Sequence, residues 1–265
     1  MSKKVAIVTG GTSGIGRATA LALQESGYTV YELSRRAEGM PDIRHIVADI
    51  TKEETLQAAV EQVLAAEGRL DLVVNNAGFG ISGAIEFTDT QEAQRLFDTL
   101  FFGMVRMNRC VIPLMRQQGH GRIVNISSVA SPVPIPFQAY YSAGKAAINA
   151  YTMALANELR PFGVTVCAVM PGDIKTGFTA ARHKIIDGDD IYQGRIGRSV
   201  QRMEHDEQTG MDPAKVGRYI AAVASREGSH HPLYATRIDY KFFVFLTKVL
   251  PARFLNWLIY QLYGK

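Results

Sequence analysis

The feature that most constrains the fold is a glycine-rich stretch that follows directly on a short apolar run. The run at 5–9, Val-Ala-Ile-Val-Thr, is β-branched and passes into Thr9-Gly-Gly-Thr-Ser-Gly-Ile-Gly16, after which a helical pattern begins. Gly10, Gly14 and Gly16 leave backbone amides able to approach a pyrophosphate, and a helix N-terminus adds partial positive charge. The stretch therefore predicts a dinucleotide site, and the alternative is a strand-to-helix turn that binds nothing.

Five further apolar runs alternate with amphipathic stretches, and they lie at 29–34, 43–50, 70–76, 121–128 and 163–172. The amphipathic stretches include 18–27 and 53–68. Strands that are apolar throughout and separated by helices indicate a parallel sheet covered on both faces. We predict one α/β domain over 1–265, a Rossmann-type doubly wound parallel sheet in three α/β/α layers. A substrate lid is expected at about 177–210, and an apolar C-terminal helical extension at about 241–265.

Composition limits the partners and the compartment. The 265 residues are 47% hydrophobic and 20% charged, which is typical of a globular chain with a full core. The net charge of +4 is mild and forms no basic run, so nucleic acid is not an expected partner. Cys110 and Cys167 have no metal-type spacing, and the start MSKKVAIVTG has no signal-peptide pattern. Both features favour a reducing, cytoplasmic setting.

The end of the second apolar run discriminates between two dinucleotides. A free ribose 2′-hydroxyl requires an acidic acceptor there, whereas a 2′-phosphate requires cations. The chain reads Leu33-Ser34-Arg35-Arg36, with no acid at that turn. Because a guanidinium matches a phosphate in shape and charge, we predict NADPH in preference to NADH. The alternative is that both arginines are solvated loop charges.

A second short stretch, Tyr141-Ser-Ala-Gly-Lys145, places a tyrosine four residues before a lysine. Residues four apart on a helix share a face, so the ammonium can stand beside the phenol. A free tyrosine has a pKa of about 10 and is a poor acid or base at neutral pH, but a nearby cation lowers that value. Alone, the pair is equally consistent with a solvated helix surface.

Several short motifs occur in order along the chain: the glycine turn, Asn75-Asn76-Ala77-Gly78, Ser128, Tyr141-x-x-x-Lys145 and Pro171-Gly172. Over about residues 4–178 the chain resembles the short-chain dehydrogenase/reductase family, in its compact branch with Gly-x-x-x-Gly-x-Gly in the turn. The resemblance implies a nicotinamide cofactor, a homodimer or homotetramer, and interconversion of a secondary alcohol and a ketone. Similar apolar tails occur in members resembling hydroxysteroid dehydrogenases and acyl-dihydroxyacetone-phosphate reductases.

The resemblance also implies the catalytic roles. Tyr141 is expected as general acid in reduction and general base in oxidation, while Lys145 lowers its pKa and holds the nicotinamide ribose. Ser128 is expected to hydrogen-bond the reacting oxygen. The neighbours Ser127 and Tyr140 are set aside, since one step along a strand or helix turns a side chain away.

The expected cofactor contacts come from the glycine turn, the second and third strand ends, the Asn-Asn-Ala-Gly segment, the catalytic pair and the Pro-Gly loop: Gly10, Thr12, Ser13, Gly14, Ile15, Gly16, Ser34, Arg35, Arg36, Asp49, Ile50, Asn76, Ala77, Gly78, Tyr141, Lys145, Pro171, Gly172, Ile174 and Thr176. Asn75 is also expected beside the adenosine ribose. For Asn75 and Asn76, capping of the turn is the alternative.

One position departs from the family pattern. The family commonly has an asparagine three residues before the glycine at 103, where it helps to anchor a water that leads from the lysine to solvent. Leu100 occupies that place here, and leucine can neither donate nor accept a hydrogen bond. Asn108 is too far along to replace it directly. Either the proton relay is rebuilt, or turnover is slow, or the protein is an NADP(H)-binding sensor.

The substrate side of the predicted site is apolar. The expected pocket wall is formed by Phe79, Ile81, Val133, Ile135, Pro136 and Phe137. This composition favours a small lipophilic ketone or alcohol, such as a steroid, a retinoid or an acyl-chain compound; lid packing is the alternative. No metal is expected, because Asp187-Gly-Asp-Asp190 and the histidines at 183, 205, 230 and 231 are interpreted as surface residues.

The chain ends in a long apolar stretch over 241–263. Lys248, Pro251 and Arg253 interrupt it, which argues against a membrane-spanning helix. The stretch is expected to cover the substrate pocket, to pack in a dimer, or to lie on a membrane surface. The last possibility leaves open a third function class, a lipid-binding protein at a membrane surface.

Overall fold

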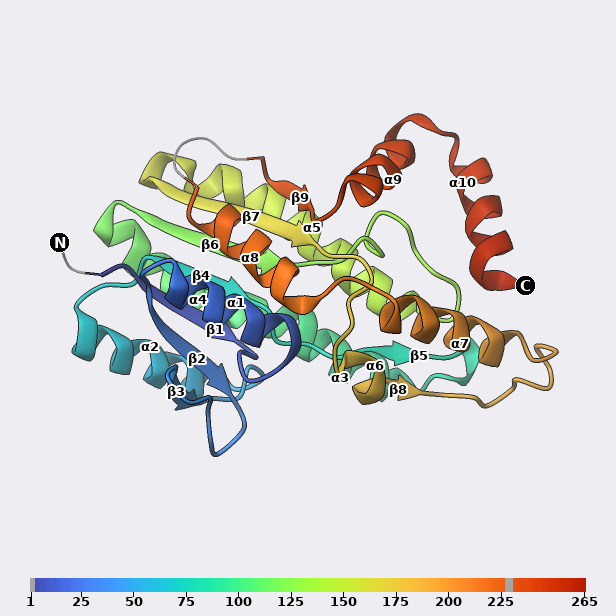
Figure 1. The fold of residues 1–265 in the computed structure, drawn as a ribbon, viewed down its shortest axis with the longest axis horizontal. Helices are drawn as coiled ribbons and strands as arrows, with labels where there is room; N and C mark the ends of the chain where they lie inside the picture. Colours follow the sequence, from blue (N-terminus) through green and yellow to red (C-terminus); the bar gives the residue numbers. More distant parts are fainter. Residues whose placement is uncertain (1–2, 227–230) are drawn as a thin grey trace.

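The computed structural model describes residues 3–226 and 231–265 (Figure 1). Within them, seven parallel strands form the central sheet. Their order across the sheet is β3 (Arg44–Val47), β2 (Thr29–Ser34), β1 (Val5–Thr9), β4 (Leu72–Asn75), β6 (Gly121–Ile126), β7 (Val164–Met170) and β9 (Leu233–Ala235). The chain starts in the middle at β1, winds outward through β2 and β3, and then returns to build the other half from β4. The order reverses between β1 and β4, where doubly wound sheets bind ligands.

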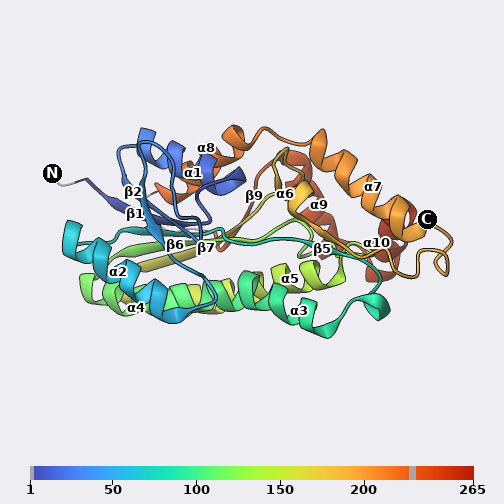
Figure 2. The same cartoon turned by 90° about the horizontal axis from the view of Figure 1, so that it is seen from below.

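Helices cover both faces of the sheet, as Figure 2 shows. One layer holds α1 (Gly14–Glu25) and α8 (Pro213–Ala224), which pack closely against each other. The other layer holds α2 (Glu53–Glu67), α4 (Gly103–Gln118) and α5 (Ala139–Leu159). The predicted Rossmann-type fold in three layers is confirmed.

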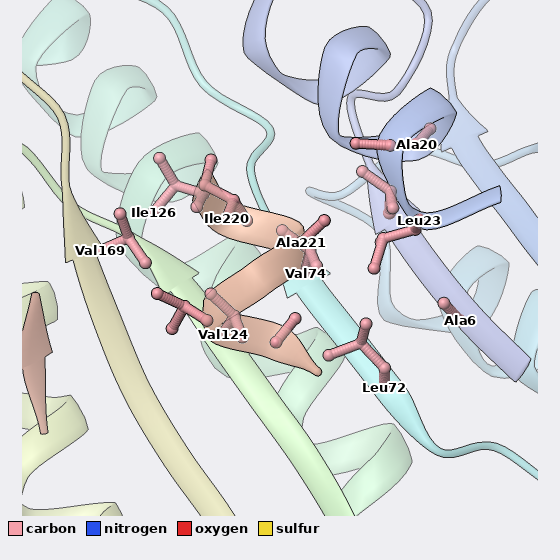
Figure 3. Close-up of a cluster of buried hydrophobic side chains, with 14 of the residues drawn as sticks. Ala6, Ala20, Leu23, Leu72, Val74, Val124, Ile126, Val169, Ile220 and Ala221 are labelled. Atoms are coloured by element: carbon pink, nitrogen blue, oxygen red, sulfur yellow. The ribbon is translucent and has the colours of Figure 1, made fainter. Parts of the chain in front are cut away.

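Two apolar cores lie between the layers, because the central strands bury side chains on both faces. All five residues of β1 are buried, and alternate ones point to opposite cores. Figure 3 shows the core under α1 and α8, where Leu23 and Ile220 meet Val74 and Val124. Each fully buried leucine or isoleucine contributes about 2 kcal/mol by leaving water.

Most of the remaining elements gather around the carboxyl ends of the strands. On the side of α5 lie η1 (Ile85–Phe87), α3 (Thr90–Phe97) and the π-helical turn η2 (Asp98–Phe102). The short turn η3 (Arg160–Phe162) lies at the opposite edge of the sheet, just before β7 begins. The segment after β7 forms α6 (Phe178–Ala181), β8 (His183–Lys184) and α7 (Arg195–Gln208), and β8 pairs with β5 (Ile81–Ser82). The chain closes with α9 (Ile238–Val249), α10 (Ala252–Ile259) and η4 (Tyr260–Gly264). The short strands β5, β8 and β9 were not predicted.

Candidate active site

A cavity of about 1240 Å³ opens at the carboxyl edge of the sheet. It runs from the glycine turn, past the ends of β2, β4 and β6, to the first turns of α5. All the catalytic and cofactor residues expected from the sequence line it, except Gly16 and Asn75. The fold therefore brings together residues that lie up to 166 positions apart in the sequence, from Gly10 to Thr176.

The glycine turn has the geometry that a pyrophosphate requires. Gly10 and Gly14 have φ of +66° and +53°, which a residue with a Cβ rarely adopts. Ser13 is extended and makes no side-chain cap, and the first turn of α1 carries no acid. The first amides of α1 are therefore free of a side-chain cap and face the cavity. Gly16 is buried instead, and it packs so closely on the carbonyl of Gly10 that a Cβ there would collide with it.

The arginines after β2 are exposed at the cavity rim. Within the described residues, neither Arg35 nor Arg36 forms an ion pair. Behind them, the buried Glu32 carboxylate pairs with His45 Nδ1, while His45 Nε2 lies 3.0 Å from the carbonyl of Arg36. Burial raises the pKa of Glu32, although His45 opposes this. Sequence reasoning missed this pair, because its two members come from different strands.

The segment after β4 ties the turn to the sheet. Asn76 Nδ2 donates to the carbonyls of Thr9 and Gly10, and the Thr9 hydroxyl accepts from the amides of Asn76 and Ala77. Asn76 thus holds the glycine turn and also lines the cavity. The expectation for Asn75 beside a ribose is wrong. Its side chain is buried and donates to Asn108 and Asn125.

The end of β3 supplies the next wall. Asp49 Oδ1 accepts from the amide and hydroxyl of Thr51, at 3.0 and 2.8 Å. Burial raises the pKa of Asp49, but these hydrogen bonds and the nearby cations Arg35 and Lys52 together outweigh it, so the net pKa is lowered. Asp49 therefore stays ionised near neutral pH and can accept hydrogen bonds from a bound ligand.

Three residues meet where β6 ends and α5 begins. Ser128 follows β6, and Tyr141 and Lys145 are one turn apart on α5. The Lys145 ammonium lies 5.6 Å from the centre of the Tyr141 ring and donates to the carbonyl of Ile126 at 2.7 Å. The neighbouring Ser127 hydroxyl is used elsewhere, since it donates to the carbonyl of Lys145.

Burial changes the pKa values of the pair in opposite directions. It raises the pKa of Tyr141 to about 12, and a hydrogen bond with Ser128 only partly opposes this. It lowers the pKa of Lys145 to about 7. In this structure burial sets the direction of the Tyr141 pKa, and the hydrogen bond with Ser128 and the Arg182 guanidinium oppose it without reversing it. The expectation that Lys145 lowers the pKa of Tyr141 stays a prediction.

Leu100 is buried in the π-helical turn η2. Its side chain lies between Gly78 and Gly144, and one methyl fills the place that a Cβ of Gly78 would take. The same cluster contains Tyr141, Phe79 and Leu96. An apolar side chain thus packs next to Tyr141 where the family pattern has an amide.

The loop after β7 closes the cavity on the side of α9. Pro171, Gly172, Ile174 and Thr176 all line it. The ring of Tyr240 packs on Gly172 where a Cβ would stand, and the Tyr240 hydroxyl accepts from the amide of Asp173 at 3.0 Å. The first turn of α9 therefore supports the loop from behind.

The substrate end differs from the expected apolar wall, since Arg95, His183 and Glu207 also line the cavity. Phe79 and Ile135 line the cavity, whereas Ile81 packs with Leu96 and Phe137 packs under α7. Val133 and Pro136 also do not line it. Sequence reasoning missed Phe178, whose ring lies 5.8 Å from that of Tyr141. The mixed composition of the segment after β7 had offered no signal for it.

The acidic cluster after β8 has a local structural role. Asp189 Oδ1 accepts from the amides of Ile196 and Gly197 at the start of α7. His183, His205 and His231 are exposed, and His230 lies outside the described residues. Across residues 3–226 and 231–265, no three His, Cys, Asp or Glu side chains are placed to hold a metal ion.

The parallel sheet, the glycine turn and the Ser–Tyr–Lys set together define a dinucleotide-dependent oxidoreductase. A profile of the short chain dehydrogenase family matches residues 4–185. The chain belongs to the short-chain dehydrogenase/reductase family, whose fold binds a nicotinamide cofactor.

Two curated proteins and one solved structure are similar to this chain. A 3-ketodihydrosphingosine reductase of Bacteroides thetaiotaomicron is 38% identical over 261 residues, which are 97% of this chain and 94% of the relative. An NADPH-dependent 1-acyldihydroxyacetone phosphate reductase of Schizosaccharomyces pombe is 34% identical over 66% of this chain and 61% of its own. A crystal structure of a short-chain dehydrogenase from Streptomyces avermitilis is 34% identical, covers 92% of each chain and has a TM-score of 0.82.

Proposed function

We propose that the protein is an NADPH-preferring reductase that converts a ketone of a lipophilic acyl-chain molecule into a secondary alcohol. The observation that carries the proposal is the placement of three side chains at one end of the cavity. Ser128, Tyr141 and Lys145 all line it, and the Lys145 ammonium lies 5.6 Å from the centre of the Tyr141 ring. Tyr141 is protonated at neutral pH, which is the form that can give a proton to the oxygen of a reduced ketone.

The residues divide the chemistry between them. A bound NADPH supplies the hydride that goes to the carbonyl carbon. Tyr141 gives its proton to the oxygen, which becomes the hydroxyl of the product. Ser128 donates a hydrogen bond to the same oxygen and stabilises its developing charge. Lys145 places an amine beside the Tyr141 ring. The residues around Lys145 exclude water, since its side chain is only 5% exposed.

The preference for NADPH rests on the rim after β2. Two guanidinium groups, at 35 and 36, stand next to the Ser34 hydroxyl and line the cavity. Glu32, the acid of this strand, is fully buried and paired with His45, so it is not available to a ribose hydroxyl. A 2′-phosphate would meet two cations there.

The substrate class rests on the cavity wall and on the relatives. Phe79, Ile135 and Phe178 present apolar surface next to Tyr141. The two curated relatives described above are named as reductases of 3-ketodihydrosphingosine and of 1-acyldihydroxyacetone phosphate. Both names describe a ketone on a lipid-related molecule, which supports an acyl-chain ketone ahead of a steroid or retinoid.

The test is consumption of NADPH and NADH by the purified protein with acyl-chain, steroid, retinoid and small aromatic ketones. We expect turnover on the acyl-chain ketones with NADPH. Tyr141→Phe should keep NADPH affinity and lose at least about a hundredfold in rate. Tyr140→Phe is the matched control, because Tyr140 does not line the cavity.

A sensor that binds NADPH without turnover is the second candidate, and Leu100 is the observation that favours it. Tight NADPH binding with no turnover on any ketone class would support the sensor and contradict the reductase. Turnover that is insensitive to Tyr141→Phe would contradict the assigned chemistry.

A further inference from the structure

The helix α9 presents a continuous apolar face to water. Ile238, Phe242, Phe245 and Val249 are between 55% and 83% exposed. Their spacing of four, three and four residues places all of them on one side of the helix. Because single exposed apolar residues are ordinary but contiguous ones are not, this face indicates a binding surface.

The next helix extends the exposed surface. On α10, Phe254 and Trp257 are about half exposed, and their rings stack with centroids 5.8 Å apart. Figures 1 and 2 both place α9 and α10 beyond the carboxyl ends of the strands, at the end of the molecule that holds the cavity. We call the exposed side chains at 238, 242, 245, 249, 254 and 257 the tail surface.

The charge of the C-terminal segment distinguishes the two possible binding partners of this surface, an anionic membrane and a second copy of the chain. The last 29 residues, 237–265, contain five Lys or Arg and one Asp, a net charge of +4 that equals the charge of the whole chain. On the α9 wheel, Lys241 and Lys248 fall at one edge of the apolar stripe. Among the described residues, Lys241, Lys248 and Arg253 form no ion pair with an acid. Binding of a second copy of the chain through this surface would bring two such cationic surfaces together, and their repulsion disfavours that occupant.

We propose that the tail surface docks on an anionic lipid bilayer. Apolar and aromatic side chains with cations at their edge fit the boundary between headgroups and acyl chains. Each cation near an anionic surface adds attraction. No helix of the described residues is long and apolar enough to span a membrane, so the contact is with the surface. The proposal goes beyond the reductase function and does not depend on it.

Co-sedimentation with vesicles tests the docking. The probes are phosphatidylcholine vesicles with and without phosphatidylglycerol, at low and high salt. We expect the full chain to bind the anionic vesicles and to be released by salt. Phe242→Ser with Phe245→Ser should weaken binding by about tenfold or more. Lys241→Gln with Lys248→Gln should weaken it about thirtyfold.

The control variant removes equally exposed apolar residues elsewhere. Ile186 and Ile191 are each 67% exposed on the segment before α7, and Ile186→Ser with Ile191→Ser should bind vesicles like the parent chain. Melting curves and NADPH binding check that every variant folds.

Two outcomes would overturn the proposal. One is that the parent chain fails to bind anionic vesicles, or that the phenylalanine and lysine variants bind as the parent does. The other is a dimer in solution that dissociates in the Phe242→Ser and Phe245→Ser variant, which would assign the tail surface to a second copy. Since the test does not measure turnover, its failure would leave the reductase proposal unaffected.

Discussion

At the scale of single residues, burial determines the protonation states in the site. The same desolvation that raises the pKa of Tyr141 to about 12 lowers the pKa of Lys145 to about 7. Near neutral pH the pair therefore consists of a neutral phenol and a partly charged amine.

The lowered pKa of Lys145 predicts a pH-dependent stability. Between the folded value of about 7 and the ordinary value of 10.5, the unfolded chain binds more protons, so raising the pH stabilises the fold. Below about pH 7 the full penalty of burying the charge is present. Lys145→Met removes it, and should therefore raise the free energy of unfolding most at pH 7 and progressively less toward pH 10.

Denaturant unfolding at several pH values measures this difference. Lys175→Met is the control, because Lys175 is exposed and its substitution should give no such trend. A difference between Lys145→Met and the parent chain that stays constant from pH 7 to pH 10 would contradict the lowered pKa.

The cofactor rim gives a second residue-scale prediction. Arg35→Ala removes a guanidinium that offers charge-assisted hydrogen bonds to a 2′-phosphate. The ratio of NADPH to NADH affinity should fall by roughly tenfold or more, with little change for NADH itself. Arg160→Ala, at an exposed site after α5, is the control. Equal losses for both dinucleotides would mean that Arg35 acts without recognising the phosphate.

At the scale of elements, sequence reasoning worked where local pattern determines structure. The predicted runs at 5–9 and 29–34 match β1 and β2 residue for residue, since strands buried on both faces are apolar throughout. The three-residue β9 has too little sequence for a pattern and depends on its pairing with β7. Asn75 was misassigned for a related reason, because its partners Asn108 and Asn125 come from distant elements.

The contact between Leu100 of η2 and Gly78, which follows β4, can be tested by substituting both residues. A methyl group added at Gly78 would meet a methyl of Leu100, so Gly78→Ala should destabilise the fold by about 1–3 kcal/mol and weaken NADPH binding. Leu100→Ala in the same chain should recover much of that loss, because it makes room. Unfolding free energies of the two single variants and the double variant measure the coupling.

Gly177→Ala is the matched control for the added methyl group. A Cβ there would meet no atom within 4 Å, so stability should hardly change. If the losses from Gly78→Ala and Leu100→Ala simply add, the contact between them is not what requires glycine at 78.

At the scale of the whole molecule, the C-terminal extension joins two parts of the site. Its first turn supports the loop after β7 through Tyr240, as described above. Its last turn holds α7, where the Tyr263 hydroxyl donates to Asp206 at 3.0 Å and Arg195 donates to the carbonyl of Gly264. The sequence showed an apolar tail but not these attachments, since hydrogen bonds over 57 and 69 residues leave no local pattern. The homodimer or homotetramer stays a prediction.

The two attachments should separate NADPH binding from the stability of α7. Tyr240→Ala leaves Gly172 and Asp173 without their support, so NADPH affinity should fall by roughly tenfold. Tyr263→Ala frees α7 instead, so NADPH affinity should hold while proteolysis within 187–194 becomes faster. Titration with NADPH and a time course of limited proteolysis measure the two effects. If Tyr263→Ala weakened NADPH binding as much as Tyr240→Ala does, the extension would act as one unit, and the loop after β7 and the helix α7 would not be held independently.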